Sequence, residues 1–148
     1  MKISTKGRYG LRILLDLALH AKESPRQMKE IAQSQQISEK YISRLILSLN
    51  KAGLIISLRG AKGGLQLAKP PKEITLLDII EAMEGPVCIV ECVADKTFCK
   101  KSGDCSACKV WSALNKKIKK QMQEVTLKDL LKSEKNRIGR LSVWLRVH

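Results

Sequence analysis

Aromatic side chains and uninterrupted apolar runs are both scarce in this sequence. Trp, Tyr and Phe together make up 3% of the chain, which suits helices packed with Leu and Ile better than a β-sandwich. The apolar segment from Gly7 to Ala21 is interrupted by Arg12 and Asp16, so it is too short for a membrane span or a secretion signal. We therefore expect a cytoplasmic protein without a membrane partner.

The signatures of common enzyme classes are also missing. The sequence contains no GxSxG nucleophile motif, no phosphate-binding P-loop and no HExxH zinc motif. Its two histidines, His20 and His148, lie far along the chain from the cysteines, which argues against a metalloenzyme. We do not expect this protein to be an enzyme.

Acidic residues are few compared with basic ones. The chain has 28 Lys and Arg against 14 Asp and Glu, a net charge of +14. Residues 1–69 hold thirteen of the basic residues and four of the acidic ones, so this half alone carries +9. A merely solubilising surface would be spread more evenly, whereas a concentrated positive field attracts polyanions, most often nucleic acid.

Apolar periodicity and turn residues predict five elements in the first half. Three are helices, at residues 7–22, from Arg26 onward, and at 39–52. Two are strands, at residues 54–58 and 65–68. Ser38 is a good N-cap for the third helix, and Gly53 ends it. This order of elements is typical of a winged helix-turn-helix: two helices, a short turn, a third helix and a basic hairpin. We therefore predict a mainly α fold with a small β-hairpin wing.

Three parts are expected along the chain. Residues 1–84 form the DNA-binding domain, in which a fourth helix is capped by Thr75. Residues 85–109 form a cysteine-rich loop without convincing periodicity. Residues 110–148 form a long helix and a C-terminal segment. One stripe of the long helix is apolar, and we predict that it makes the dimer interface: Trp111, Leu114, Ile118 and Met122.

The third helix and the hairpin tip hold the predicted DNA contacts. On the helix these are Ser38, Lys40, Tyr41 and Arg44, and at the tip they are Arg59, Gly60, Lys62 and Gly63. The Arg44 guanidinium can reach guanine O6 and N7 together, and Arg59 between flexible glycines can enter a narrow minor groove. The alternative for each residue is an ordinary solvated side chain.

Five cysteines, at positions 88, 92, 99, 105 and 108, lie within 21 residues. From Cys92 to Cys108 the spacing is C-x6-C-x5-C-x2-C, which lets a polar loop wrap its thiolates around one iron–sulfur centre. A thiol redox sensor is the second interpretation. Zinc is the third, because structural zinc usually uses two tight knuckles and only Cys105 and Cys108 form one. Cys88 is expected to be a small buried residue.

Several segments resemble the iron–sulfur cluster transcription regulators, a winged-helix family that includes IscR, NsrR and CymR. They are MKISTKGRYG, ISEKYISRLILSLNKAGLI, SLRGAKGGLQLAKP and the cysteine loop before Trp111. The resemblance implies a homodimer on a pseudo-palindromic DNA operator, with the 110–122 helix crossing its partner. It also implies Cys92, Cys99 and Cys105 as cluster ligands, although their first gap is one residue longer than in IscR, and CymR relatives lack these cysteines.

Cys108 stands where IscR has a histidine ligand, and its x2 spacing from Cys105 makes it our predicted fourth ligand. The resemblance to IscR favours a [2Fe–2S] over a [4Fe–4S] cluster. We therefore expect a repressor or activator whose operator binding depends on the cluster. A thiol-redox or zinc-binding regulator is the first alternative. An iron–sulfur carrier or electron-transfer protein is a weaker one, because the basic wing would then have no purpose.

Overall fold

The computed structural model describes residues 2–101 and 103–147, with side-chain surroundings given through residue 138. Along the chain the elements are α1 (Thr5–Leu19), α2 (Met28–Gln35), α3 (Glu39–Lys51), β1 (Ile55–Leu58), β2 (Gly64–Leu67), a 3-10 turn (Pro71–Glu73), α4 (Leu76–Glu84), α5 (Glu91–Ala94), α6 (Ser106–Glu124) and α7 (Leu127–Val147). The prediction of a mainly helical winged-helix fold is confirmed. No helix in the described part of the chain is long and apolar enough to cross a membrane.

The main core lies between α1, α2, α3, α4, the hairpin and the start of α7. Ile13 and Leu14 of α1 and Ile42 and Leu49 of α3 are completely buried, as is Ile31 of α2. These residues recur at helical spacing, so each helix presents one apolar face to the same centre. The core consequently fixes α3 against α1 and leaves the opposite face of α3 outside.

Local capping explains most helix ends. The Ser38 hydroxyl accepts from the Tyr41 backbone at the start of α3, and Gly53 follows that helix with φ +68°. The predicted start of the second helix near Arg26 is wrong, because α2 begins at Met28. Arg26 instead pairs as extended backbone with Leu65, through N···O distances of 3.0 and 2.8 Å. This pairing is long-range and leaves no local signal.

The wing is a two-stranded antiparallel hairpin. Ile55 pairs with Leu67 and Leu58 with Gly64, so residues 59–63 form the tip. Ile55 and Leu65 are buried against the helices, whereas Ile56 and Leu58 are exposed. The hairpin is thus anchored at its base and free at its tip.

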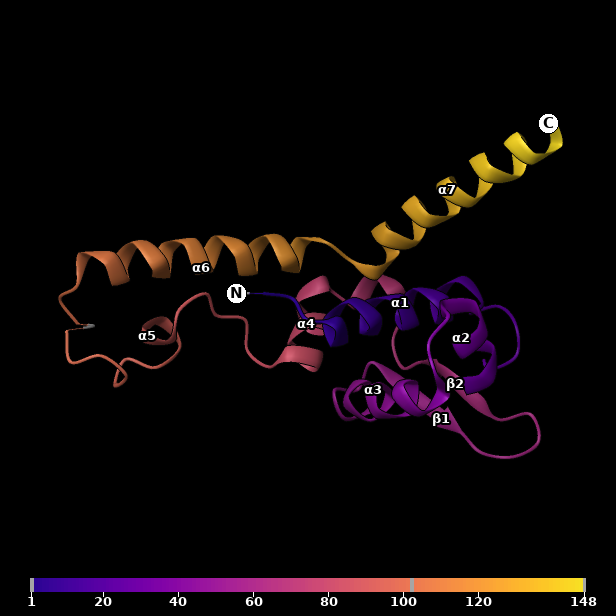
Figure 1. Ribbon diagram of the computed structural model, residues 1–148, viewed down its shortest axis with the longest axis horizontal. Helices are drawn as coiled ribbons and strands as arrows, with labels where there is room; N and C mark the ends of the chain where they lie inside the picture. The colour runs from indigo at the N-terminus through magenta and orange to yellow at the C-terminus, as the bar shows by residue number, and fades with distance from the viewer. Residues whose placement is uncertain (1, 102, 148) are drawn as a thin grey trace.

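α5 and most of α6 extend away from this core, whereas α4 and the first turn of α7 pack in it through Ile79, Met83 and Leu127 (Figure 1). α6 begins at Ser106, four residues before the predicted start of the long helix, so Cys108 lies in its first turn. The later turns of α6 pack on α4 in a small cluster made by Leu77, Ile80, Val87 and Met122. α7 begins where Thr126 bridges Thr75, and it diverges from α6.

Candidate DNA-binding surface and cysteine loop

The outer face of α3 is positively charged and exposed. Lys40 and Arg44 lie one turn apart on it, and their side chains form no hydrogen bond or ion pair within the described residues. The wing tip lies with α3 on the side of the molecule away from α6 and α7 (Figure 1). A helix and a hairpin presented together on one side are what a winged helix offers to a duplex.

Ser38 and Tyr41 have structural roles at the start of α3. The Ser38 hydroxyl caps the helix by accepting from the Tyr41 N–H at 3.3 Å. The half-buried Tyr41 ring meets Tyr9 edge to face, with centroids 5.8 Å apart, and the Arg12 guanidinium lies 5.2 Å from the Tyr9 centroid. These contacts tie the first turn of α3 to α1, so both residues orient the helix in addition to any contact with DNA.

The wing tip depends on glycine at two positions. Gly60 has φ +104°, which side-chain-bearing residues rarely adopt, and its carbonyl accepts from the Gly63 N–H at 2.9 Å. A Cβ at Gly63 would overlap the carbonyl oxygen of Leu58. The tight turn leaves Arg59 and Lys62 fully outside the core, as predicted for side chains that reach DNA.

A buried carboxylate connects the parts of the DNA-binding half. Asp16 of α1 is 2% exposed and accepts hydrogen bonds from Ser34, from Gln35 Nε2 at 2.9 Å and from Arg26 Nε at 3.0 Å. Burial by itself would raise the pKa of this carboxyl. The hydrogen bonds and the Arg26 charge outweigh burial and hold the pKa below its usual value. Since Arg26 pairs with Leu65, Asp16 holds α2 and the base of the wing together.

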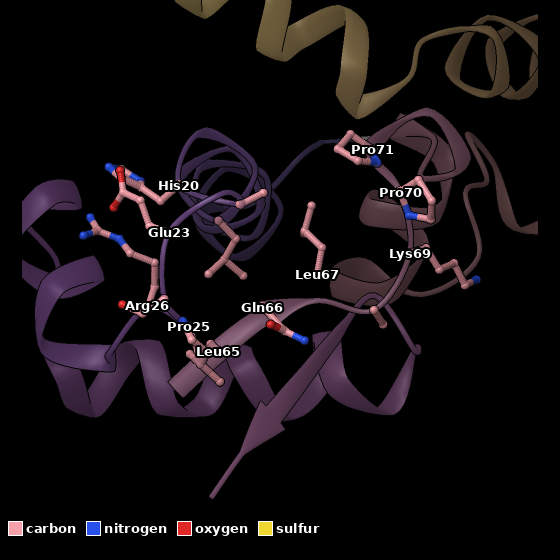
Figure 2. A pocket seen from close by; sticks show the side chains of 14 residues that line it. His20, Glu23, Pro25, Arg26, Leu65, Gln66, Leu67, Lys69, Pro70 and Pro71 are labelled. Atoms are coloured by element: carbon pink, nitrogen blue, oxygen red, sulfur yellow. The ribbon is translucent and has the colours of Figure 1, made fainter. Parts of the chain in front are cut away.

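An open pocket of about 390 Å³ lies beside this contact (Figure 2). The segment joining α1 to α2 forms one wall, with His20, Glu23 and Arg26. The strand β2 and the chain that follows it form the other, ending at Pro70 and Pro71. The pocket therefore lies between the base of the wing and the segment that joins α1 to α2, next to the Arg26 pairing.

Two of the predicted ligand cysteines lie together. Cys108 in the first turn of α6 is buried, and its thiol lies 3.7 Å from the carbonyl oxygen of Cys92 in α5. Desolvation raises the pKa of Cys92, and the neighbouring Cys108 thiol raises the pKa further. A cavity of about 340 Å³ beside them is also lined by Lys109 and Lys116.

The other two predicted ligands lie apart from this pair. Cys99 is exposed, and it raises the pKa of Cys92 less than Cys108 does. Cys105 is half-buried and is the N-cap residue of α6. In residues 2–101 and 103–147, no group of three or more His, Cys, Asp or Glu is arranged to hold a metal ion. Cys88, expected to be buried, is half-buried and donates to the Val90 carbonyl at 2.9 Å.

The predicted dimer stripe on α6 is divided between two environments. Met122 is 9% exposed and packs within its own chain, and half-buried Ile118 packs beside it. Trp111 and Leu114 are 41% and 42% exposed, and neighbouring Val110 is 62% exposed. The exposed apolar surface is therefore at the outer end of α6, whereas the inner part of the predicted stripe packs within its own chain.

Comparison with known proteins identifies the chain's relatives. A family described as Rrf2, iron-dependent transcriptional regulator, matches residues 3–133. The chain belongs to the Rrf2 family. It is 40% identical to protein rrf2 of Nitratidesulfovibrio vulgaris over 132 residues, 89% of this chain and 88% of that protein.

Solved structures agree with this assignment. CymR of Bacillus subtilis is 42% identical over 130 residues, covering 88% of this chain and 89% of that protein. Its structure matches 90% of this chain and 98% of that chain with a TM-score of 0.74. The structure of T. potens IscR is 40% identical and covers 90% of this chain and 88% of its own, with a TM-score of 0.71. The chain is thus a DNA-binding transcription regulator, and the predictions of family and of no enzymatic role are confirmed.

Proposed function

We propose that this regulator binds a pseudo-palindromic operator as a homodimer, and that an iron–sulfur cluster held by its loop cysteines controls the binding. The observation that carries the DNA-binding part is the exposed cationic surface of α3 and the wing, on one side of the molecule. Arg44 would read a guanine in the major groove, and Arg59 would enter the adjacent minor groove. Lys40 and Lys62 would bind phosphates and add affinity without sequence preference.

Donor chemistry and partial clustering support the cluster. Cys92 and Cys108 already lie side by side, and Lys109 and Lys116 line the cavity beside them, so a negatively charged cluster would have positive charges near it. Cys99 and Cys105 would complete the set if the segment between α5 and α6 closed over the pair. When bound, such a cluster supplies a centre sensitive to iron supply and oxidation. The description of the family as iron-dependent supports this proposal.

The outer end of α6 supports the homodimer. Val110, Trp111 and Leu114 expose apolar surface on consecutive turns, and an exposed apolar patch of this kind marks an interaction site. A second copy of the same helix would cover it. Cys108 lies one turn before Trp111, so ordering of the cysteine loop would act directly on the helix that joins the two chains.

Anaerobic reconstitution tests the cluster. Wild type, Cys108→Ala and Cys88→Ala are loaded with iron and sulfide, and visible absorption, iron content and operator affinity are measured. We expect Cys108→Ala to lose the chromophore and its effect on DNA binding, while Cys88→Ala keeps both. The opposite pattern would assign the fourth ligand to Cys88, and two unchanged spectra would exclude both residues as ligands.

A second candidate is a regulator that senses thiol oxidation. The adjacency of Cys92 and Cys108 favours it, and the CymR relative is described as a global cysteine regulator. In this case peroxide would change DNA binding in protein without iron, and the change would require both cysteines. Iron-free protein that ignores peroxide would exclude this candidate.

A further inference from the structure

Leu47 is an apolar side chain on the face of α3 that points away from the core. It is 71% exposed, more than any other large hydrophobic side chain in the described part of the chain. It belongs to neither apolar cluster, whereas Ile46 and Leu49 of the same helix are buried. Burial within its own chain therefore does not account for a leucine at this position.

Its neighbours place Leu47 at the centre of the DNA-binding face. Lys40, Arg44, Leu47 and Lys51 are all exposed and recur at spacings of four, three and four residues, so they share one side of the helix. The nearby Ser43 hydroxyl is engaged, because it donates to the Lys40 carbonyl at 2.8 Å. Arg44 and Leu47 are thus both exposed at mid-helix, and within the described residues Arg44 forms no hydrogen bond or ion pair and Leu47 lies in neither apolar cluster.

We propose that Leu47 contacts the C5-methyl group of a thymine beside the guanine read by Arg44, and so selects a T·A pair. This inference rests on the proposed binding of α3 in the major groove. Thymine is the base that presents a methyl group there, and an aliphatic side chain is its natural contact. Three residues advance about 4.5 Å along a helix, and base pairs are stacked about 3.4 Å apart, so the two bases lie within two base pairs.

Selection from random duplex DNA identifies the bases involved. Full-length wild type, Arg44→Ala and Leu47→Ala are each used to select sequences. We expect the guanine preference to disappear with Arg44→Ala, and a thymine preference within two base pairs of it to disappear with Leu47→Ala. A control, Ile138→Ala, removes an exposed aliphatic side chain on α7, away from α3, and should leave both preferences unchanged.

Removal of the methyl group alone tests the contact. Uracil replaces that thymine in the selected duplex, and affinities are measured for wild type and Leu47→Ala. Wild type should bind the uracil duplex about three- to tenfold more weakly, because a buried methyl contact is lost. Leu47→Ala, checked for unchanged thermal unfolding, should not distinguish the two duplexes.

The outcomes separate the two proposals. If wild type selects a sequence but binds thymine and uracil duplexes equally, the role of Leu47 is wrong and the DNA-binding proposal stands. An equal uracil penalty in Leu47→Ala also overturns the role of Leu47. If wild type selects no sequence at all, sequence-specific binding itself fails.

Discussion

The charge of Asp16 is expected to hold the DNA-binding half together. The matched change is Asp16→Asn, which keeps the shape of the side chain and removes the charge from a site that is 2% exposed. Three side-chain donors lose a charged acceptor, each such bond being worth about 1.5–3 kcal/mol. Arg26 keeps Glu30 at 3.7 Å, so we expect the lower end of the range for a broken buried pair, about 3 kcal/mol.

Denaturation by urea at fixed protein concentration measures this loss, since unfolding of a dimer depends on concentration. A loss of about 3 kcal/mol corresponds to a fall in melting temperature of roughly 6–12 °C for a chain of this size. Asp129→Asn is the control, because it removes an exposed carboxylate that only caps α7, and it should cost much less. A variant at position 16 as stable as this control would refute the argument.

The pH dependence gives a second readout of the same residue. The pKa of Asp16 is lower in the folded protein than the unfolded value of about 3.9, so its charge contributes stability above that pH. The contribution is lost as the pH falls through the folded pKa. The difference in stability between wild type and Asp16→Asn should therefore be largest above about pH 5 and shrink with further acidification.

Four other changes test the wing, the dimer surface and the end of α3. Arg59→Ala should weaken operator binding by about 1–3 kcal/mol and relax a preference for A·T-rich minor groove, whereas Lys62→Ala should weaken all sequences alike and lower the salt slope by about one. An unchanged Arg59→Ala profile in gel shifts would contradict the wing assignment. Leu114→Glu places a charge on the outer face of α6 and should yield folded monomers by sedimentation, and a folded dimer would place the interface elsewhere. Gly53→Ala should lower the free energy of unfolding in urea by about 1 kcal/mol, because Gly53 has a φ of +68°. No atom lies within 4 Å of the added Cβ, so the loss comes from the backbone conformation alone, and an equally stable variant would show that this backbone is not strained.

The order of elements in the first half could be predicted because its signals are local. Ser38 and Thr75 bond to backbone groups three residues away, and Gly53 ends its helix by its own conformation. The extended pairing of Arg26 could not be predicted, because its partner is almost 40 residues later. The burial of Asp16 could not be predicted either, since its donors Arg26 and Gln35 lie 10 and 19 residues later and the residue interrupts an apolar pattern.

The site predictions were limited by what periodicity cannot distinguish. An apolar stripe identifies a buried face but not the chain that covers it, so Met122 and Trp111 looked alike although one packs on α4 and the other is exposed. The start of α6 was missed because Ser106 and Ala107 carry no apolar period. Leu47 had one available signal, which is its position outside the inward-facing residues of α3.

The contacts of α4 indicate where a signal from the cysteine loop can act. Glu84 accepts from Ser4 and Gly7 at the start of α1, and Glu81 binds Lys119 of α6 at 2.9 Å. Together with the packing of α4 in both apolar clusters, these bonds join the base of α6 to the DNA-binding half. We therefore expect the DNA-binding half and the C-terminal end of α6 to keep their relative position when the cysteine loop orders.

The outer turns of α6 are different, because they pack mainly on α5, which itself carries Cys92. A change at the cysteines therefore alters the surface around Trp111 before it alters α3. In the proposed dimer this surface would set the distance between the two copies of α3, and a palindromic operator would accept a narrow range of such distances. The proposed control of DNA binding by the loop would thus require the second chain, and a monomer should bind half-sites without responding to the state of its cysteines.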